Sequence, residues 1–185
     1  MAVRVDAALP VHPLTVTDVY AMLEAGILDE DDHIELLDGV LVEMSPQSPQ
    51  HAYALRRLTM LAAPVAAAAG LVLSIQGPLD VGSPITLPEP DFAIVPFTPI
   101  DRHPSGALLV VEMGNTSLRI DLGPKARIYA AAQVPDYWVL DVKRREIVVH
   151  REPSGSRFEQ VRRAGAGETL TALAVELAVP VSDLV

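Results

Sequence analysis

The chain has 185 residues, of which 50% are hydrophobic, and its 24 acidic and 14 basic side chains give a formal net charge of −10. A chain of this length and composition can bury a sizeable core, which predicts one compact domain. The acidic balance excludes a protein that holds nucleic acid by diffuse positive charge, so any polyanion must be bound locally or through metal ions. The absence of cysteine excludes disulfides and cysteine nucleophiles, and it is consistent with a reducing, cytoplasmic location.

A helix and a hairpin are predicted within residues 14–45. The helix has apolar side chains at helical spacing after a threonine cap. The hairpin consists of two β-like runs joined by Asp38-Gly39, which is a strong signal for a tight turn. In that register Glu35 shares one face of the hairpin with apolar side chains, so its carboxylate needs a partner or exposure at the hairpin edge.

An alanine-rich helix follows from about residue 51 to residue 69. The stretch 58–75 is apolar enough to raise the question of a membrane span. Pro64, Gly70 and Ser74 divide this stretch, and its second part is rich in β-forming residues. We interpret it as the end of the helix followed by a strand, and we expect no membrane partner.

The second half of the chain is dominated by β-like runs. A helix is expected between the runs "ALLVVEM" and "DYWVLDV", where it can serve as the crossover between two parallel strands. The predicted strands cover residues 71–81, 90–96, 107–113, 136–142 and 146–152, with the helix at about 121–133. This order predicts an α/β (α+β) domain in which a central mixed sheet is flanked by helices.

We expect one domain over residues 1–185. It divides into an N-terminal helix and hairpin extension at about 14–45, a core at about 50–152, and C-terminal strands with a turn at about 157–185. The chain shows no internal repeat and no linker composition that would separate two domains.

Two carboxylates meet at one edge of the predicted sheet. If residues 90–96 and 107–113 are neighbouring antiparallel strands, Asp91 at the start of one lies beside Glu112 at the end of the other. Neighbouring carboxylates repel each other unless a cation or a proton lies between them. Hard oxygen ligands in this arrangement suit Mg²⁺, which keeps coordination positions open for water and a phosphate oxygen. The alternative is that each carboxylate is a solvated charge at a strand end.

Lys125 is one of only two lysines in the chain. Asp121 and Pro124 are typical of a helix start, which would place Lys125 in the first turn. A cation there faces the positive end of the helix dipole, at a cost of up to about 1 kcal/mol. The carboxylates of Asp91 and Glu112 would offset this cost if they were close. The alternative is an exposed lysine on a solvated face.

Five segments carry a resemblance to a known family. They are "IELLDGVLVEMSP", "PEPDFAIV", "LLVVEMGNTS", "DLGPKARIYAAAQVPDYWVLD" and the closing "VPVSDLV". In their order and spacing they resemble the Uma-type family of restriction endonucleases, within the PD-(D/E)xK nuclease superfamily. The similarity runs from Leu14 to the C-terminus, and it implies a restriction-endonuclease-like core.

The resemblance also implies a metal site and a catalytic lysine. Asp91, Glu112 and the backbone carbonyl of Met113 would hold Mg²⁺ or Mn²⁺. The superfamily usually has its lysine two residues after the glutamate, where this chain has Gly114, and Lys125 in the next helix matches the family's lysine instead. Lys125 would position or help to deprotonate the attacking water and stabilise charge on phosphorus.

Two further residues are second-tier candidates. Glu35 matches an acidic position of the family's hairpin segment and is a catalytic candidate, although an internal salt bridge explains it about as well. His51 lies near a helix start and could contact a phosphate or a water, yet a lone histidine there is more often structural.

Three functions are compatible with these residues. The leading prediction is a metal-dependent endonuclease that hydrolyses DNA phosphodiester bonds. The alternatives are a non-catalytic dimeric interaction protein that retains the nuclease fold, and a small-molecule phosphohydrolase. Retention of the set Asp91, Glu112 and Lys125 favours an enzyme. A homodimer is expected, because a nuclease domain of this size often needs a partner to span a duplex, and a two-fold dimer is the simplest closed assembly.

Overall fold

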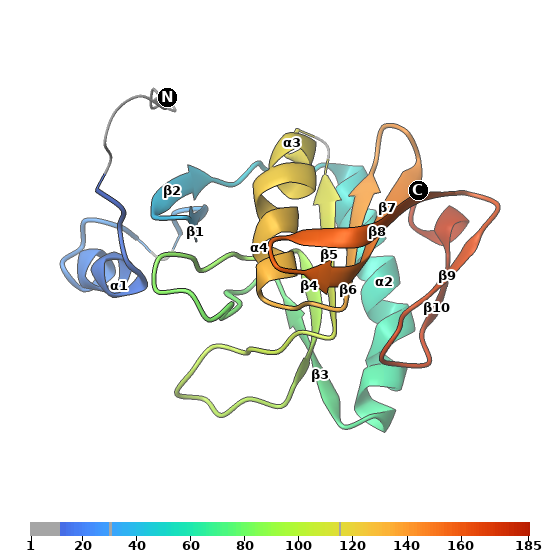
Figure 1. Ribbon diagram of the computed structural model, residues 1–185, viewed down its shortest axis with the longest axis horizontal. Coiled ribbons are helices and arrows are strands. Elements are labelled where there is room, and N and C mark those ends of the chain that lie inside the picture. Colours follow the sequence, from blue (N-terminus) through green and yellow to red (C-terminus); the bar gives the residue numbers. More distant parts are fainter. Residues whose placement is uncertain (1–11, 30, 115) are drawn as a thin grey trace.

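The computed structural model describes residues 12–29, 31–114 and 116–185, so residues 1–11 of the predicted domain lie outside the described residues. Its centre is a six-stranded mixed sheet with helices on both faces, which confirms the predicted α+β fold (Figure 1). The elements in chain order are α1 (Val16–Glu24), β1 (Ile34–Leu37), β2 (Val40–Glu43), α2 (Pro49–Ala68), β3 (Leu71–Ile75), β4 (Phe92–Pro96), β5 (Leu109–Gly114), α3 (Leu118–Ile120), the π-helical turn η1 (Asp121–Lys125), α4 (Ala126–Ala131), β6 (Asp136–Asp141), β7 (Glu146–Ser154), β8 (Arg157–Gly165), β9 (Thr169–Thr171), β10 (Ala178–Pro180) and the 3₁₀ turn η2 (Val181–Asp183).

The hairpin β1–β2 forms as predicted. Asp38 and Gly39 at its turn have φ values of +50° and +79°, which is the backbone of the tightest antiparallel connections. The Gly39 turn packs so closely on Pro13 that a Cβ at position 39 would lie 2.3 Å from the Pro13 Cβ. Glu35 pairs with Val42 across the hairpin, and its side chain is buried. The local turn therefore determines which face of the hairpin carries the carboxylate.

The central sheet has the strand order β3-β4-β5-β6-β7-β8. Every neighbouring pair is antiparallel except β5 and β6, which are parallel. The connection between these two strands is the helical run α3-η1-α4, as the crossover prediction requires. Strand β8 extends the sheet beyond the predicted core.

Two boundaries differ from the sequence prediction in a way that affects the site. Strand β5 ends at Gly114, one residue beyond the predicted end at residue 113, because Gly114 still pairs with Asp141 of β6. The helical run begins at Leu118 rather than at Asp121 and continues through the π-helical turn into α4. The residues taken as a helix start therefore lie inside the run.

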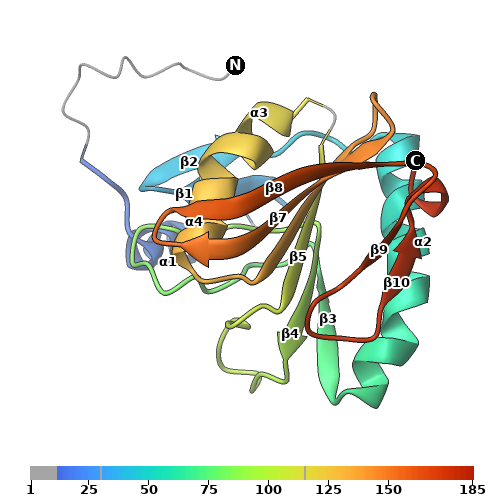
Figure 2. The same cartoon turned by 45° about the vertical axis from the view of Figure 1, so that its right-hand side comes forward.

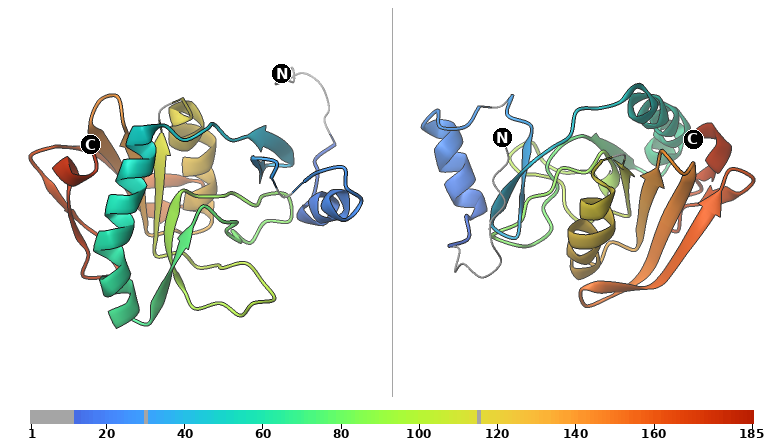
Figure 3. Two further views of the ribbon diagram at one scale, coloured as in Figure 1. Left: turned by 180° about the vertical axis from the view of Figure 1, so that it is seen from behind. Right: turned by 90° about the horizontal axis from the view of Figure 1, so that it is seen from above.

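Each face of the sheet is covered by a different part of the chain (Figure 2). Helix α2 packs on one face through an alanine-rich and leucine-rich stripe that includes Ala54, Leu58 and Ala62, all fully buried. The C-terminal strands β9 and β10 lie beside α2 and close the same core (Figure 3). Helix α4 covers the opposite face, where Tyr129 and Tyr137 are fully buried.

The apolar stretch 58–75 is divided as predicted between the end of α2 and strand β3. Among the residues that the structure describes, no helix is long and apolar enough to cross a membrane.

Candidate active site

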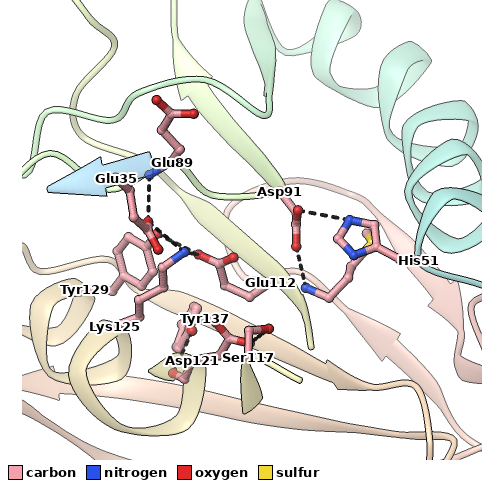
Figure 4. A network of polar contacts seen from close by, with 11 residues as sticks. Glu35, His51, Glu89, Asp91, Glu112, Ser117, Asp121, Lys125, Tyr129 and Tyr137 are labelled. Atoms are coloured by element: carbon pink, nitrogen blue, oxygen red, sulfur yellow. Dashed lines mark hydrogen bonds and ion pairs between the residues drawn. The ribbon is translucent and has the colours of Figure 1, made fainter. Parts of the chain in front are cut away.

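A cleft with a volume of about 420 Å³ opens where the hairpin β1–β2, the start of α2, the strands β4 and β5 and the turn η1 come together. Figure 4 shows its polar side chains at close range. The cleft is lined by all of the residues that the sequence singled out for chemistry, namely Glu35, His51, Asp91, Glu112, Met113 and Lys125.

Asp91 and Glu112 are neighbours because of the register of two strands. Phe92 of β4 pairs with Val111 of β5, so the residue before Phe92 and the residue after Val111 lie side by side. Asp91 is 9% exposed and Glu112 is 3% exposed, so both carboxylates are largely removed from water. The alternative that they are solvated strand-end charges is wrong for both.

Lys125 lies between two carboxylates. Its Nζ is 2.9 Å from Glu35 Oε2 and 3.0 Å from Glu112 Oε1, and the residue as a whole is 4% exposed. Tyr129, one turn further along the helical run, donates a hydrogen bond from its hydroxyl to the same Glu112 oxygen at 2.8 Å. The internal salt bridge that could explain Glu35 thus exists, and its partner is Lys125.

The prediction that Lys125 occupies the first turn of a helix is wrong. Lys125 ends the π-helical turn in the middle of the run, so the helix dipole does not oppose its charge. Pro124 has no N–H to give to the i−4 carbonyl, and a π-helical turn is one way in which a helix accommodates this loss. Of the two carboxylates predicted to hold the lysine, Glu112 does so, whereas Glu35 takes the place expected for Asp91, and the lysine is buried.

Burial favours the neutral forms of the carboxyl groups in the cleft. Burial raises the pKa of Glu112 well above its usual range, although the charge of Lys125 opposes this shift. Burial also raises the pKa of Asp121 to about 6. Burial alone would lower the pKa of Lys125, but the charges of Glu112 and Glu35 outweigh it and raise that pKa above its ordinary value. Lys125 is therefore a fixed cation at neutral pH.

Gly114 explains why the lysine does not stand two residues after Glu112. A Cβ at position 114 would lie 2.7 Å from Leu118 Cδ2 and 2.8 Å from Asp121 Oδ2. The start of the helical run packs directly over this strand end, so it leaves no space for a side chain. The ammonium group that contacts Glu112 instead belongs to Lys125, at the end of the turn η1.

His51 brings the start of α2 into the site. Its Nε2 lies 3.0 Å from Asp91 Oδ1, close enough for an ion pair but without the alignment of a hydrogen bond. Burial lowers the pKa of His51, but the interactions with Asp91 and with the Met113 backbone outweigh burial and raise it. The other Asp91 oxygen, Oδ2, accepts the Met113 N–H at 2.8 Å. Asp91 is thus oriented from two sides.

The sequence of residues 18–182 matches the family Uma2, which is described as "Putative restriction endonuclease". This match covers most of the chain. The chain belongs to the Uma2 family.

A solved structure supports the same fold for this Uma2 chain. It is the crystal structure, at 1.96 Å resolution, of "a putative nuclease belonging to DUF820 from Anabaena variabilis ATCC 29413". The two structures superpose with a TM-score of 0.70 over 93% of this chain and 97% of the other, at 11% sequence identity. No curated protein matches the chain. Family and fold together indicate a nuclease that resembles restriction endonucleases.

No role in the site was predicted from the sequence for Asp121 and Glu89, which line the Uma2 cleft, or for Tyr129, which donates to Glu112. Asp121 was taken as a helix cap, but its carboxylate lines the cleft and accepts a hydrogen bond from the Ser117 hydroxyl at 2.7 Å. Tyr129 was hidden in an apolar helical pattern. Glu89 lies in the segment before β4, where its backbone N–H donates to Glu35 Oε2 at 3.1 Å. The signal for Glu89 in the sequence was the segment "PEPDFAIV", which carries the family resemblance and contains this glutamate two residues before Asp91.

Glu89 also stands at the border of a second cavity. This cavity has a volume of about 340 Å³, lies against α1 and β1, and shares Glu35 and Glu89 with the main cleft. Burial and the charge of Glu35 raise the pKa of the Glu89 carboxyl. His103 also lines this second cavity, where it contacts Tyr20, whereas His150 packs against Tyr137.

Carboxylate and carbonyl oxygens of the Uma2 cleft are ligands of the type that Mg²⁺ or Mn²⁺ prefers. Within residues 12–29, 31–114 and 116–185, no group of three or more His, Cys, Asp or Glu side chains is arranged to hold a metal ion. The available set is smaller, with the carboxylates of Asp91 and Glu112 and the carbonyl of Met113. Mg²⁺ is commonly held by one or two carboxylates and completes its shell with water. Burial is the main cause of the raised pKa of Glu112, and the neighbouring carboxylates of Asp121 and Asp91 raise it further, an effect that a bound cation would oppose.

Proposed function

We propose that the chain is an endonuclease that hydrolyses DNA phosphodiester bonds with Mg²⁺ or Mn²⁺. The observation that carries this proposal is the convergence of Asp91, Glu112 and Lys125, from three different elements, on one open cleft. A lysine buried between two carboxylates is a weak source of stability, since desolvation opposes the attraction of the charges. The nuclease class of the family gives this arrangement a chemical use.

Lys125 acts as a fixed positive charge. With its raised pKa it stays protonated, so it cannot take a proton from water, and the expected help with deprotonation does not fit the structure. Two of its three N–H donors have partners in the described part of the chain, Glu35 and Glu112. The third can donate to a phosphate oxygen and stabilise the negative charge that develops there.

The acidic residues divide the remaining tasks. Asp91, Glu112 and the carbonyl of Met113 would hold the divalent cation, which when bound polarises the phosphate and lowers the pKa of a bound water. Glu35 positions Lys125 and is itself held by the N–H of Glu89. The Glu89 carboxyl, with its raised pKa, is the candidate to accept a proton in the cleft.

The start of α2 suits a phosphate. Ser48 and His51 line the cleft, and Ser48 caps the helix by accepting the His51 N–H at 3.2 Å. Pro49 has no N–H and the N–H groups of His51 and Ala52 are bonded to Ser48, so it is mainly the positive end of the helix dipole that favours an anion at this position. Because the chain is acidic as a whole, we expect few phosphate contacts and a shallow dependence of DNA affinity on salt.

The experiment combines metal binding with cleavage. Mg²⁺ and Mn²⁺ binding is measured by calorimetry, and cleavage is measured on closed circular single-stranded and double-stranded DNA, which only an endonuclease can open. Asp91→Asn should weaken metal binding. Lys125→Met should retain metal binding but lower turnover by roughly 10²–10⁴-fold, the range for a lost charge-stabilising group. Arg127→Met is the control, because Arg127 forms an exposed ion pair with Asp38.

The outcomes separate the possible functions. Unchanged cleavage by folded Lys125→Met would remove the catalytic role of this lysine. Wild-type protein that binds neither metal ion and opens no DNA circle would refute the proposed function and favour the non-catalytic interaction protein. Circular dichroism at the assay temperature shows whether each variant is folded.

A further inference from the structure

The two edges of the central sheet are built differently. Strand β8 forms one edge, and its exposed positions carry charge: Arg157, Glu159, Arg162 and Arg163. Strand β3 forms the other edge with the sequence LVLSI, which has no charged residue and no proline. Charges and prolines on edge strands are the usual means by which proteins prevent pairing with another strand. Edge β8 has this protection and edge β3 does not.

Strand β3 also lies within a long stretch of the chain that has no charged residue. No charged residue occurs from position 58 to position 79, which covers the second half of α2 and all of β3. Several apolar side chains of this segment are exposed, including Met60 at 67%, Val72 at 40% and Ile75 at 38%. In a chain with a net charge of −10, this is where a second copy can approach with the least repulsion.

We propose that β3 is the dimer interface, where it pairs antiparallel with β3 of a second copy of this chain. Among the described residues β3 pairs only with β4, so the N–H and C=O groups along its other side are available to a partner strand. Self-pairing of one strand is isologous, so it closes at two copies and does not propagate. The neutral segment supplies the apolar contacts beside the new strand pair.

This pairing determines how the two copies are arranged. An antiparallel pair related by a two-fold axis has that axis normal to the sheet, so both α2 helices lie on the same face of a continuous sheet. Gln76, just after β3, donates its N–H to the Asp91 carbonyl at 3.2 Å, so the cleft lies at the C-terminal end of β3. The two clefts therefore lie at opposite ends of the β3 pair. The interface itself contains none of the cleft residues, so the inference stands independently of the proposed function.

Analytical ultracentrifugation without metal or DNA tests the interface. The wild type should sediment as a dimer of the 19.8 kDa chain at micromolar concentration. Val72→Lys places two like charges near the two-fold axis and should weaken the dimer at least about tenfold. Val161→Lys is the matched control, because Val161 is 56% exposed on the protected edge strand β8, and it should leave the dimer unchanged.

Cysteine substitution provides a second test that does not depend on a destabilising charge. The chain has no cysteine, so Val72→Cys introduces a single thiol. A short bis-maleimide should crosslink Val72→Cys into a covalent dimer and should leave Val161→Cys monomeric on a denaturing gel. A monomeric wild type at about 100 μM, well above the micromolar range of weak specific association, would overturn the inference. A dimer that dissociates in neither variant, or that crosslinks through Val161→Cys, would overturn it as well.

Discussion

Replacement of Lys125 by methionine should destabilise the metal-free protein strongly and in a pH-dependent way. Methionine keeps most of the length and volume of the side chain, so the main change is the loss of charge. The ammonium group now contacts Glu35 at 2.9 Å and Glu112 at 3.0 Å, and all three residues are at most 5% exposed. Its loss leaves two buried carboxylates without their cation. Removal of one partner from a buried ion pair typically costs about 3–5 kcal/mol.

Protonation limits this cost. Instead of keeping a bare charge, the variant can protonate Glu112, whose ordinary pKa is 4.5. At pH 7.5 this costs about 4 kcal/mol, because the pH lies about three units above that pKa and each unit is worth about 1.36 kcal/mol. At pH 5.5 the same limit is about 1.4 kcal/mol. The pKa of Glu112 is already raised in the native wild type, and loss of the opposing Lys125 charge raises it further, so the stability lost through the substitution should shrink as the pH falls towards 5.

Urea denaturation of the wild type and the variant at several pH values between 5 and 8 measures this difference. Arg127→Met is the control, since Arg127 lies two residues further along the helical run and pairs with Asp38 with half of its side chain exposed. Exposed pairs are worth about 0–1 kcal/mol, so the control should change little at any pH. A loss below about 1 kcal/mol for Lys125→Met, or one equal at all pH values, would refute the reasoning that buried carboxylates need this cation.

Three further predictions concern the same cleft. Asp121→Asn should stabilise the protein at pH 7–8 by up to about 3 kcal/mol and should have no effect below about pH 4. The reason is that the pKa of Asp121 is about 6 in the folded protein and 3.8 in its ordinary state, so ionisation of this carboxyl opposes folding. A gain that is the same at pH 4 and pH 8 would contradict this. Gly114→Ala should cost about 1–3 kcal/mol in urea denaturation, because its methyl group would lie 2.7 Å from Leu118, whereas Gly167→Ala, with nothing within 4 Å, should be tolerated. Mn²⁺ at about 100 times its Kd should stabilise the wild type by about 2.7 kcal/mol in thermal unfolding. Asp91→Asn should lose most of this gain, and an equal gain in both proteins would place the ion elsewhere.

Much of the fold could be predicted because its signals are local. The Asp38-Gly39 turn is specified by two neighbouring residues that accept positive φ, and it determines the register that pairs Glu35 with Val42. The parallel pairing of β5 and β6 follows from the helix that must connect them. The adjacency of Asp91 and Glu112 follows from the antiparallel pairing of two short apolar strands.

The errors occurred where a local pattern allowed two conformations. Asp121 and Pro124 suit the start of a helix, but a π-helical turn inside a run accommodates them as well. Strand β5 includes Gly114, beyond the predicted end at residue 113, because β6 offers a partner as far as Gly114, and no local property of these residues indicates this partner. Both errors concern where an element begins or ends, which is determined by neighbours distant in the sequence.

The sequence by itself determined which residues can do chemistry in this protein: a buried strand that carries a carboxylate, a second acid before the neighbouring strand, and a rare lysine. Only the tertiary structure decided the state of that lysine. The local sequence around a helical lysine does not distinguish a solvated position from a buried one. The environment of Lys125 depends on Glu35, which contacts it from the hairpin β1–β2, distant in the sequence. The pKa shifts of Glu112 and Lys125 arise from burial and from charges brought together by folding. These are long-range effects, so no local sequence pattern encodes them.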